Sequence, residues 1–165
     1  MVAPRILIVE DEQLAAKHLT MNLTALGYEV VAAVSSGEAA LQLVAETIPD
    51  LILMDIMLEG EMDGIETAEQ IRSRLEIPVV FLTGYGDEDL VRRASRTRPY
   101  GYLLKPWREE EVRTTIEVAL YKHKVDKEAR LLGRELNGRK GRVFFRIDQT
   151  TEGFFQRKWT KDRVL

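Results

Sequence analysis

Residues 5–12 read RILIVEDE: after Arg5 comes an apolar run of four residues, which is followed at once by three acids. Short apolar runs without alternation are typical of strands that are buried on both faces of a parallel sheet. Residues 51–54 (LILM) repeat this pattern and are also followed by an acid, Asp55. These two stretches predict central strands of an α/β sheet, each with a carboxylate at its carboxyl end.

Strand-like and helix-like segments alternate along the rest of residues 1–121. We predict further strands at residues 28–34, 78–82 and 102–104, and helices at residues 13–26, 35–47, 64–75, 87–96 and from 107 onward. Along residues 13–26 the helical spacing is carried by Leu14, His18, Met21 and Leu26. Because parallel neighbours are joined by right-handed, helical crossovers, five such alternations predict a doubly wound sheet with helices on both faces.

Composition narrows the class of protein. With 165 residues, 45% of them hydrophobic and 31% charged, the chain has room for one ordinary domain and an appendage. The absence of cysteine excludes disulfides, thiolate metal sites and a cysteine nucleophile. No apolar run reaches the roughly 18 residues of a membrane span, and no signal peptide precedes the first strand. We therefore expect a cytoplasmic protein without a membrane partner.

The net charge of −3 is divided unevenly along the chain. Residues 1–121 carry 11 basic and 21 acidic residues, a balance of −10, whereas residues 122–165 carry 13 and 6, a balance of +7. Such asymmetry indicates two regions with different functions. We expect a domain at residues 1–121 and a basic C-terminal extension at residues 122–165.

Polar residues follow four of the predicted strands, at the edge where α/β sheets bind ligands. Glu10 and Asp11 follow the first strand, Asp55 the third, Thr83 the fourth and Lys105 the fifth. Like charges about 4 Å apart cost roughly 4 kcal/mol at an effective dielectric constant near 20, so gathered carboxylates need a cation. Oxygen ligands alone favour Mg²⁺ or Mn²⁺, and a nearby hydroxyl and ammonium suit a phosphoryl group.

The motifs ILIVEDE, LILMDIML, FLTG and YLLKP, in this order and spacing, make residues 4–121 resemble the receiver domain of two-component response regulators. The resemblance implies a five-stranded, flavodoxin-like (βα)5 fold. It implies a phosphorylation-dependent switch, not a turnover enzyme, whose phosphoryl donor is a histidine kinase or phosphotransfer protein. The implied catalytic residues are Asp55 as the phosphoryl acceptor, Thr83 and Lys105. The implied Mg²⁺ ligands are Glu10, Asp11, Asp55 and the backbone carbonyl of Met57, with Asp11 more direct than Glu10.

The resemblance also implies a switch. Thr83 would turn toward the phosphoryl group, and Tyr102 would move from an exposed to a buried position in the space that Thr83 leaves. The Lys105–Pro106 peptide bond would be cis.

The loop after Asp55 departs from the family pattern. Glu59 stands where the family usually has proline, and the loop up to Asp63 is one residue longer than its commonest form. Glu59 and Glu61 add negative charge close to the predicted site. Met57 and Tyr85 occupy positions that tune phosphoryl lifetime in the family, and neither side chain is an acid or amide that could orient a hydrolytic water.

The extension allows two structural interpretations. Neither proline nor glycine interrupts the last helix before Gly133, and a 3–4 spacing of apolar residues marks either a coiled-coil seam or a helix that folds back on its own domain: Val118, Val125, Ala129, Leu132 and Leu136. Residues 141–148 and 154–160 are predicted to form a β-hairpin, in which aromatic and basic residues are interleaved.

Three functions fit the sequence. The first is a phosphorylation-operated switch without a conventional output domain, expected to be a homodimer. The second is a regulator that binds nucleic acid through the basic, aromatic extension. The third is a metal-dependent phosphatase that uses Asp55. Such enzymes commonly need a second acid two residues later, where this chain has Met57.

Overall fold

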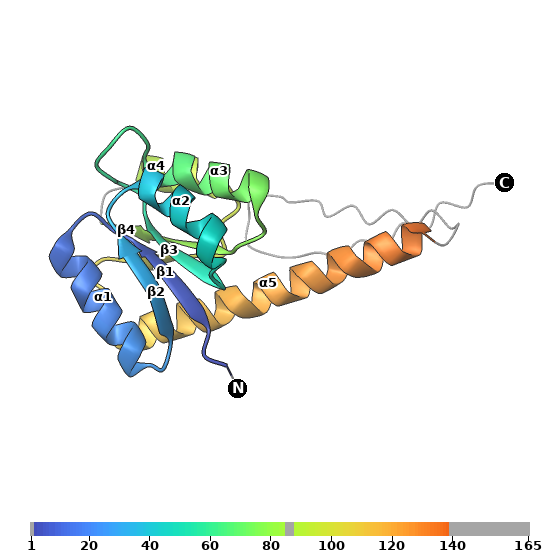
Figure 1. Ribbon diagram of the computed structural model, residues 1–165, viewed down its shortest axis with the longest axis horizontal. Helices are drawn as coiled ribbons and strands as arrows, with labels where there is room; N and C mark the ends of the chain where they lie inside the picture. The colour runs from blue at the N-terminus through green and yellow to red at the C-terminus, as the bar shows by residue number, and fades with distance from the viewer. Residues whose placement is uncertain (1, 85–87, 139–165) are drawn as a thin grey trace. The chain divides into compact units, whose positions relative to one another are not determined.

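The computed structural model describes residues 2–84 and 88–138, in which five strands alternate with five helices (Figure 1). The elements are β1 (Arg5–Val9), α1 (Gln13–Ala25), β2 (Glu29–Val34), α2 (Gly37–Thr47), β3 (Leu51–Asp55), α3 (Gly64–Arg74), β4 (Val79–Thr83), α4 (Glu88–Ser95), β5 (Gly101–Leu104) and α5 (Glu109–Gly138).

The five strands form one parallel sheet in the order β2-β1-β3-β4-β5. The chain therefore winds outward from β1 in both directions, and the predicted doubly wound (βα)5 fold is confirmed. Because all strands point the same way, the ends of β1, β3, β4 and β5 meet at one edge of the sheet. That edge brings together the polar residues that the sequence places after these strands.

The sheet is covered on both faces, and successive strand residues alternate between two cores. Leu7 and Val9 of β1 face the core that is covered by α2, α3 and α4. Ile6 and Ile8 face the core that is covered by α1 and the first part of α5. All four side chains are fully buried. Burial on both faces explains why β1 and β3 are continuous apolar runs.

Two helices begin at side-chain caps. Ser36 accepts a hydrogen bond from the Ala39 amide at the start of α2, and serine is one of the residues preferred at this position. At the start of α3, Asp63 accepts from the Glu66 amide while Glu66 accepts from the Asp63 amide, which is a capping box. The second oxygen of Asp63 binds Arg93 of α4 at 2.9 Å, so this residue also links two helices.

The exposed face of α1 differs from the expectation. The spacing of Leu14, His18 and Met21 marks the helix correctly, but Leu14 and Met21 are 76% and 62% exposed. The buried residues are Leu19 and Leu23, which pack against β1 and α5. The sequence has two apolar stripes on this helix, and only tertiary packing selects between them.

The last helix begins two residues later than expected. The Arg108 carbonyl accepts the Val112 amide, and the Arg108 amide donates to the Glu111 carboxylate, so Arg108 precedes the first turn. Trp107 therefore lies outside α5, where its ring stacks on His18 with a centroid distance of 6.2 Å.

Helix α5 continues through Gly133 to Gly138, as the uninterrupted sequence predicts. The chain divides into two compact units, residues 1–124 and residues 125–165. The predicted hairpin at residues 141–160 lies outside the described residues, as does Tyr85. Within the described part, none of the helices combines the length and apolar character that crossing a membrane requires.

Candidate functional site

The site is built at the carboxyl edge of the sheet. Asp55 is the last residue of β3 and Thr83 is the last residue of β4, and each is only 6% exposed. β3 lies between β1 and β4, so Asp55 is placed at the centre of the edge. The expected strands ended one residue earlier, with both polar residues just outside.

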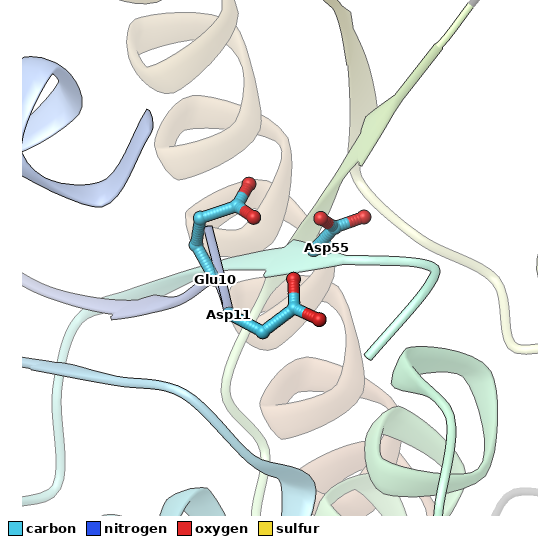
Figure 2. A group of neighbouring side chains, drawn as sticks. All are labelled: Glu10, Asp11 and Asp55. Carbon is cyan, nitrogen blue, oxygen red and sulfur yellow. The ribbon is translucent and has the colours of Figure 1, made fainter. Parts of the chain in front are cut away.

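Three carboxylates converge at this edge. Glu10, Asp11 and Asp55 offer oxygen atoms that all lie within 4.8 Å of one another (Figure 2). Glu10 is 2% exposed, so its charge is poorly solvated. An all-oxygen donor set with this spacing fits a hard divalent cation such as Mg²⁺. The fold thus brings together the three residues that were predicted to bind the metal through their side chains.

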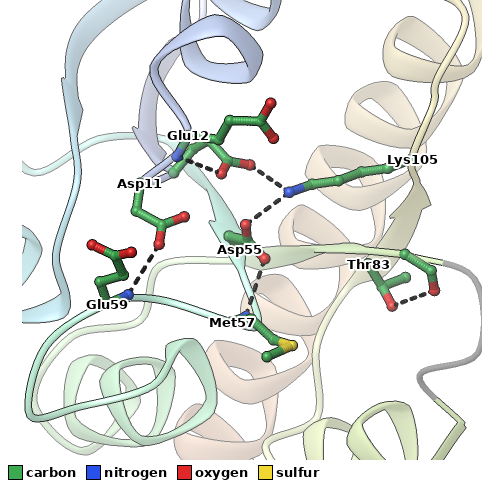
Figure 3. Close-up of polar contacts among 9 residues, drawn as sticks. Asp11, Glu12, Asp55, Met57, Glu59, Thr83 and Lys105 are labelled. Atoms are coloured by element: carbon green, nitrogen blue, oxygen red, sulfur yellow. Dashed lines mark hydrogen bonds and ion pairs between the residues drawn. The ribbon is translucent and has the colours of Figure 1, made fainter.

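Lys105 lies between two of these carboxylates. Its Nζ atom is 2.7 Å from Glu10 Oε2 and 2.7 Å from Asp55 Oδ2 (Figure 3). The Lys105–Pro106 peptide bond is cis, as the family resemblance implies. One ammonium beside three carboxylates leaves a formal deficit of two positive charges, which is the charge that a divalent cation would supply.

Backbone amides fix the orientation of each carboxylate. The Met57 amide donates to Asp55 Oδ1 at 3.1 Å, and the Glu12 amide donates to Glu10 Oε1 at 3.0 Å. The Glu59 amide donates to Asp11 Oδ2 at 3.1 Å (Figure 3). Each bond leaves the second oxygen of its carboxylate for another partner. The Met57 side chain is 62% exposed, and the hydrogen bond to the Asp55 carboxylate comes from the Met57 backbone.

Gly64 is a positioning residue that was not predicted from the sequence. Its amide donates to the Ile56 carbonyl at 2.9 Å, directly after Asp55. A Cβ atom at Gly64 would overlap the backbone carbonyl oxygen of Asp55. The close approach of α3 to β3 therefore requires glycine here. The sequence shows a glycine at this position, directly after Asp63. It does not show that this glycine lies against the backbone of Asp55 and Ile56.

The predicted switch residues occupy neighbouring strands. Thr83 Oγ1 makes a 3.4 Å contact with the Gly84 carbonyl. The Tyr102 ring lies 6.2 Å from Phe81, and its hydroxyl is 3.5 Å from the Val91 carbonyl of α4. Burial raises the pKa of the Tyr102 phenol. Tyr102 is half-buried against α4 in this structure, whereas the expected starting position was exposed.

Burial dominates the ionisation of Glu10. It raises the pKa of Glu10 from 4.5 to about 7, although the hydrogen bond from Lys105 lowers it. Burial alone would lower the pKa of Lys105, but the hydrogen bonds and charges of Asp55 and Glu10 outweigh it and raise the pKa. Burial therefore makes the ionised form of Glu10 unfavourable in the folded protein, which is the electrostatic strain at this residue.

This strain predicts a pH-dependent stability difference between wild type and Glu10→Gln. Between pH 4.5 and 7 the folded state binds more protons than the unfolded state, because the pKa of Glu10 is raised on folding. Ionisation of Glu10 thus destabilises the wild type as pH rises through this window. We expect the variant to gain about 2–3 kcal/mol relative to wild type across the window. Urea unfolding in EDTA measures it, and a pH-independent difference contradicts the assignment.

Comparisons with known proteins agree with this geometry. A family model for the response regulator receiver domain matches residues 6–117. Transcriptional regulatory protein PdtaR of Mycobacterium tuberculosis is 37% identical over 119 residues, which cover 72% of this chain and 58% of that protein. Regulatory protein AtoC of Escherichia coli is 34% identical over 134 residues, which cover 81% of this chain and 29% of that protein. The chain thus spans less than two thirds of the length of these relatives.

Solved structures show the same likeness. The signal receiver domain of a modulated diguanylate cyclase from Desulfovibrio desulfuricans superposes with a TM-score of 0.72 at 39% identity, covering 76% of this chain and 99% of that chain. The N-terminal domain of a response regulator/sensory box/GGDEF three-domain protein from Carboxydothermus hydrogenoformans gives a TM-score of 0.69 at 40% identity. It covers 74% of this chain and 98% of that chain.

Proposed function

The chain belongs to the response regulator receiver family, and from this premise we propose that it is a phosphorylation-operated switch that accepts a phosphoryl group on Asp55. Receiver domains of this family act in two-component systems, bind Mg²⁺ at an acidic site and interact with histidine kinases or phosphotransfer proteins. The observation that carries the proposal for this chain is the position of Lys105, 2.7 Å from both Asp55 and Glu10. Mg²⁺-dependent mass gain on incubation with acetyl phosphate tests it.

The transfer is a nucleophilic displacement at phosphorus. A carboxylate oxygen of Asp55 forms the new P–O bond, and the P–N bond to the donor histidine breaks. The imidazole leaves with the electron pair of that bond and takes a proton from solvent. Lys105 stays beside the Asp55 carboxylate and neutralises charge on the phosphoryl oxygens.

Mg²⁺, when bound, supplies further neutralisation of the phosphoryl charge. The residues that would hold it are Glu10, Asp11, Asp55 and the Met57 carbonyl. Glu10 and Asp11 do not accept the phosphoryl group, so their role is to hold the cation. Asp55 has both roles, and the Met57 amide keeps its carboxylate in place. In this proposal the chain accepts and slowly loses its own phosphoryl group and is not a turnover enzyme.

The switch depends on Thr83. Thr83→Ala is expected to accept a phosphoryl group on Asp55 but to transmit it poorly, because no hydroxyl follows the phosphoryl oxygens. Moving a two-state element from 1:99 to 99:1 requires roughly 5.5 kcal/mol, which charge-assisted hydrogen bonds in a buried site can supply. Hydrogen exchange of residues 88–104, with and without beryllofluoride, measures the response. An undiminished response in the variant would show that Tyr102 and α4 are coupled to Asp55 by another route.

We further propose that residues 1–121 are the receiver domain and that residues 122–165, a basic extension, support a homodimer. The apolar spacing of α5 continues beyond the domain, and Leu131 and Leu132 are 50% and 59% exposed. The balances of −10 and +7 allow the extension of one copy to meet the domain of another.

Light scattering of the full chain and of residues 1–124 tests the dimer. We expect about twice the monomer mass for the full chain and the monomer mass for the shorter chain. Large aromatic side chains bury about 150–250 Å² each, worth roughly 25 cal/mol per Å², against association costs of about 4–15 kcal/mol. The free energy gained by burying a few such side chains is similar to the cost of association, so phosphorylation is expected to shift the monomer–dimer equilibrium. Two monomers at micromolar concentration, phosphorylated or not, would refute the dimer.

A second candidate function is nucleic-acid binding by the extension, favoured by its basic balance of +7. PdtaR, which matches residues of this chain over 58% of its own length, is named a transcriptional regulatory protein. Binding to a random oligonucleotide that weakens steeply with salt and disappears on deletion of residues 138–165 would support this function.

A further inference from the structure

The loop between β3 and α3 contacts Asp11, a predicted metal ligand from a distant part of the sequence. The Glu59 amide donates to Asp11 Oδ2 at 3.1 Å across 48 residues of chain. In Figures 2 and 3 the other Asp11 oxygen points toward Asp55 and the gathered carboxylates. One oxygen of Asp11 is thus held by the loop while the other faces the place that a cation would occupy.

The backbone at residue 59 makes this contact possible. Proline has no N–H, so the residue that the family usually has at this position could not donate the bond. The next residue, Gly60, has φ = +126°, a conformation that favours glycine, and a Cβ atom there would lie 3.3 Å from Glu38 Oε2 of α2. The lengthened loop thus turns directly after Glu59, at a residue whose backbone favours glycine.

The other carboxylates of the site are held in the same manner. Met57 and Glu12 donate backbone amides to Asp55 and Glu10, each from two residues along the chain. The backbone amide that donates to Asp11 belongs instead to the β3–α3 loop. Of the three, it is the carboxylate whose backbone-amide donor comes from a distant part of the chain.

We propose that the Glu59 backbone N–H is a positioning group that holds Asp11 in the orientation required to bind Mg²⁺. The inference rests on the proposed function, since it concerns the same metal site. The group that acts is the amide and not the side chain, which is exposed and whose negative charge is incidental. An amide donor to one carboxylate oxygen leaves the second oxygen oriented and charged for the cation.

The test compares variants that keep or remove the donor in the full-length protein. Glu59→Ala and Glu59→Gln keep the N–H and remove the charge, whereas Glu59→Pro removes both. Calorimetric titration with Mg²⁺ is expected to give dissociation constants within about 2-fold of wild type for the first two. For Glu59→Pro we expect Mg²⁺ binding at least about 10-fold weaker, with an unchanged unfolding midpoint in EDTA. Equal losses in all three variants, or undiminished binding by Glu59→Pro, would overturn the proposal.

A second measurement decides the matter if Glu59→Pro does not fold. In ¹⁵N-labelled wild type, the Glu59 amide proton should resonate downfield, move upfield in Asp11→Asn, and stay downfield at saturating Mg²⁺. An amide that moves upfield on addition of Mg²⁺ would show that the loop competes with the cation for Asp11, which contradicts positioning. Wild type that binds no Mg²⁺ would instead count against the proposed function itself, so the two failures are distinguishable.

Discussion

Asp55→Asn is expected to lose Mg²⁺-dependent phosphorylation by acetyl phosphate, whereas the wild type gains the mass of one phosphoryl group. The amide nitrogen and oxygen of asparagine are poor nucleophiles, and the variant cannot form an acyl phosphate at this position. We expect the rate of labelling to fall by at least about 100-fold, which corresponds to roughly 2.7 kcal/mol of transition-state stabilisation. Intact-mass spectrometry over time measures both proteins.

A matched control separates the site from the general acidity of the domain. Asp89 is an exposed acid of α4, away from the carboxylates that gather at the sheet edge. Asp89→Asn makes the same chemical change and is expected to be labelled like the wild type. Labelling of Asp55→Asn at the wild-type rate would show that the acceptor is another residue, and the proposed function would lose its central assignment.

Much of this site could be predicted from the sequence, because the apolar runs and the acids that follow them are adjacent in the chain. The runs before Glu10 and Asp55 are apolar throughout, which occurs when both faces of a strand are buried. Parallel strands bring their ends together, so acids after two central strands had to be neighbours. The convergence of Glu10, Asp11 and Asp55 follows from these two facts and is observed.

Other features depended on contacts between distant parts of the chain. The choice between Leu14 and Leu19 as the buried stripe of α1 is made by β1 and α5, and spacing alone does not distinguish them. The half-buried position of Tyr102 depends on α4, whose Val91 carbonyl lies 3.5 Å from its hydroxyl. The sequence shows that Glu59 replaces the usual proline. It does not show that the Glu59 amide donates to Asp11, because the two residues are 48 positions apart.

Gly64 illustrates the same limit and gives the second large expected effect. Gly64→Ala is expected to destabilise the protein by about 3 kcal/mol, because the new methyl group would overlap the Asp55 carbonyl and crowd Ile56 Cα. Both contacts are backbone, so no side chain can rotate away to make room. Urea unfolding in the presence of EDTA measures the loss of stability without a contribution from bound Mg²⁺.

The same substitution should also reduce the chemistry in whatever fraction of the variant folds. The displaced atoms belong to the residue that accepts the phosphoryl group, and a misplacement of about 1 Å can cost about 100-fold in rate. Gly133→Ala is the matched control, since a Cβ atom there meets nothing within 4 Å. Alanine is the better helix former by roughly 1 kcal/mol, so the unfolding midpoint should stay the same or rise while labelling of Asp55 is unaffected. If Gly64→Ala is as stable and as readily phosphorylated as Gly133→Ala, α3 has room to move away from β3, and the close approach at Gly64 does not position Asp55.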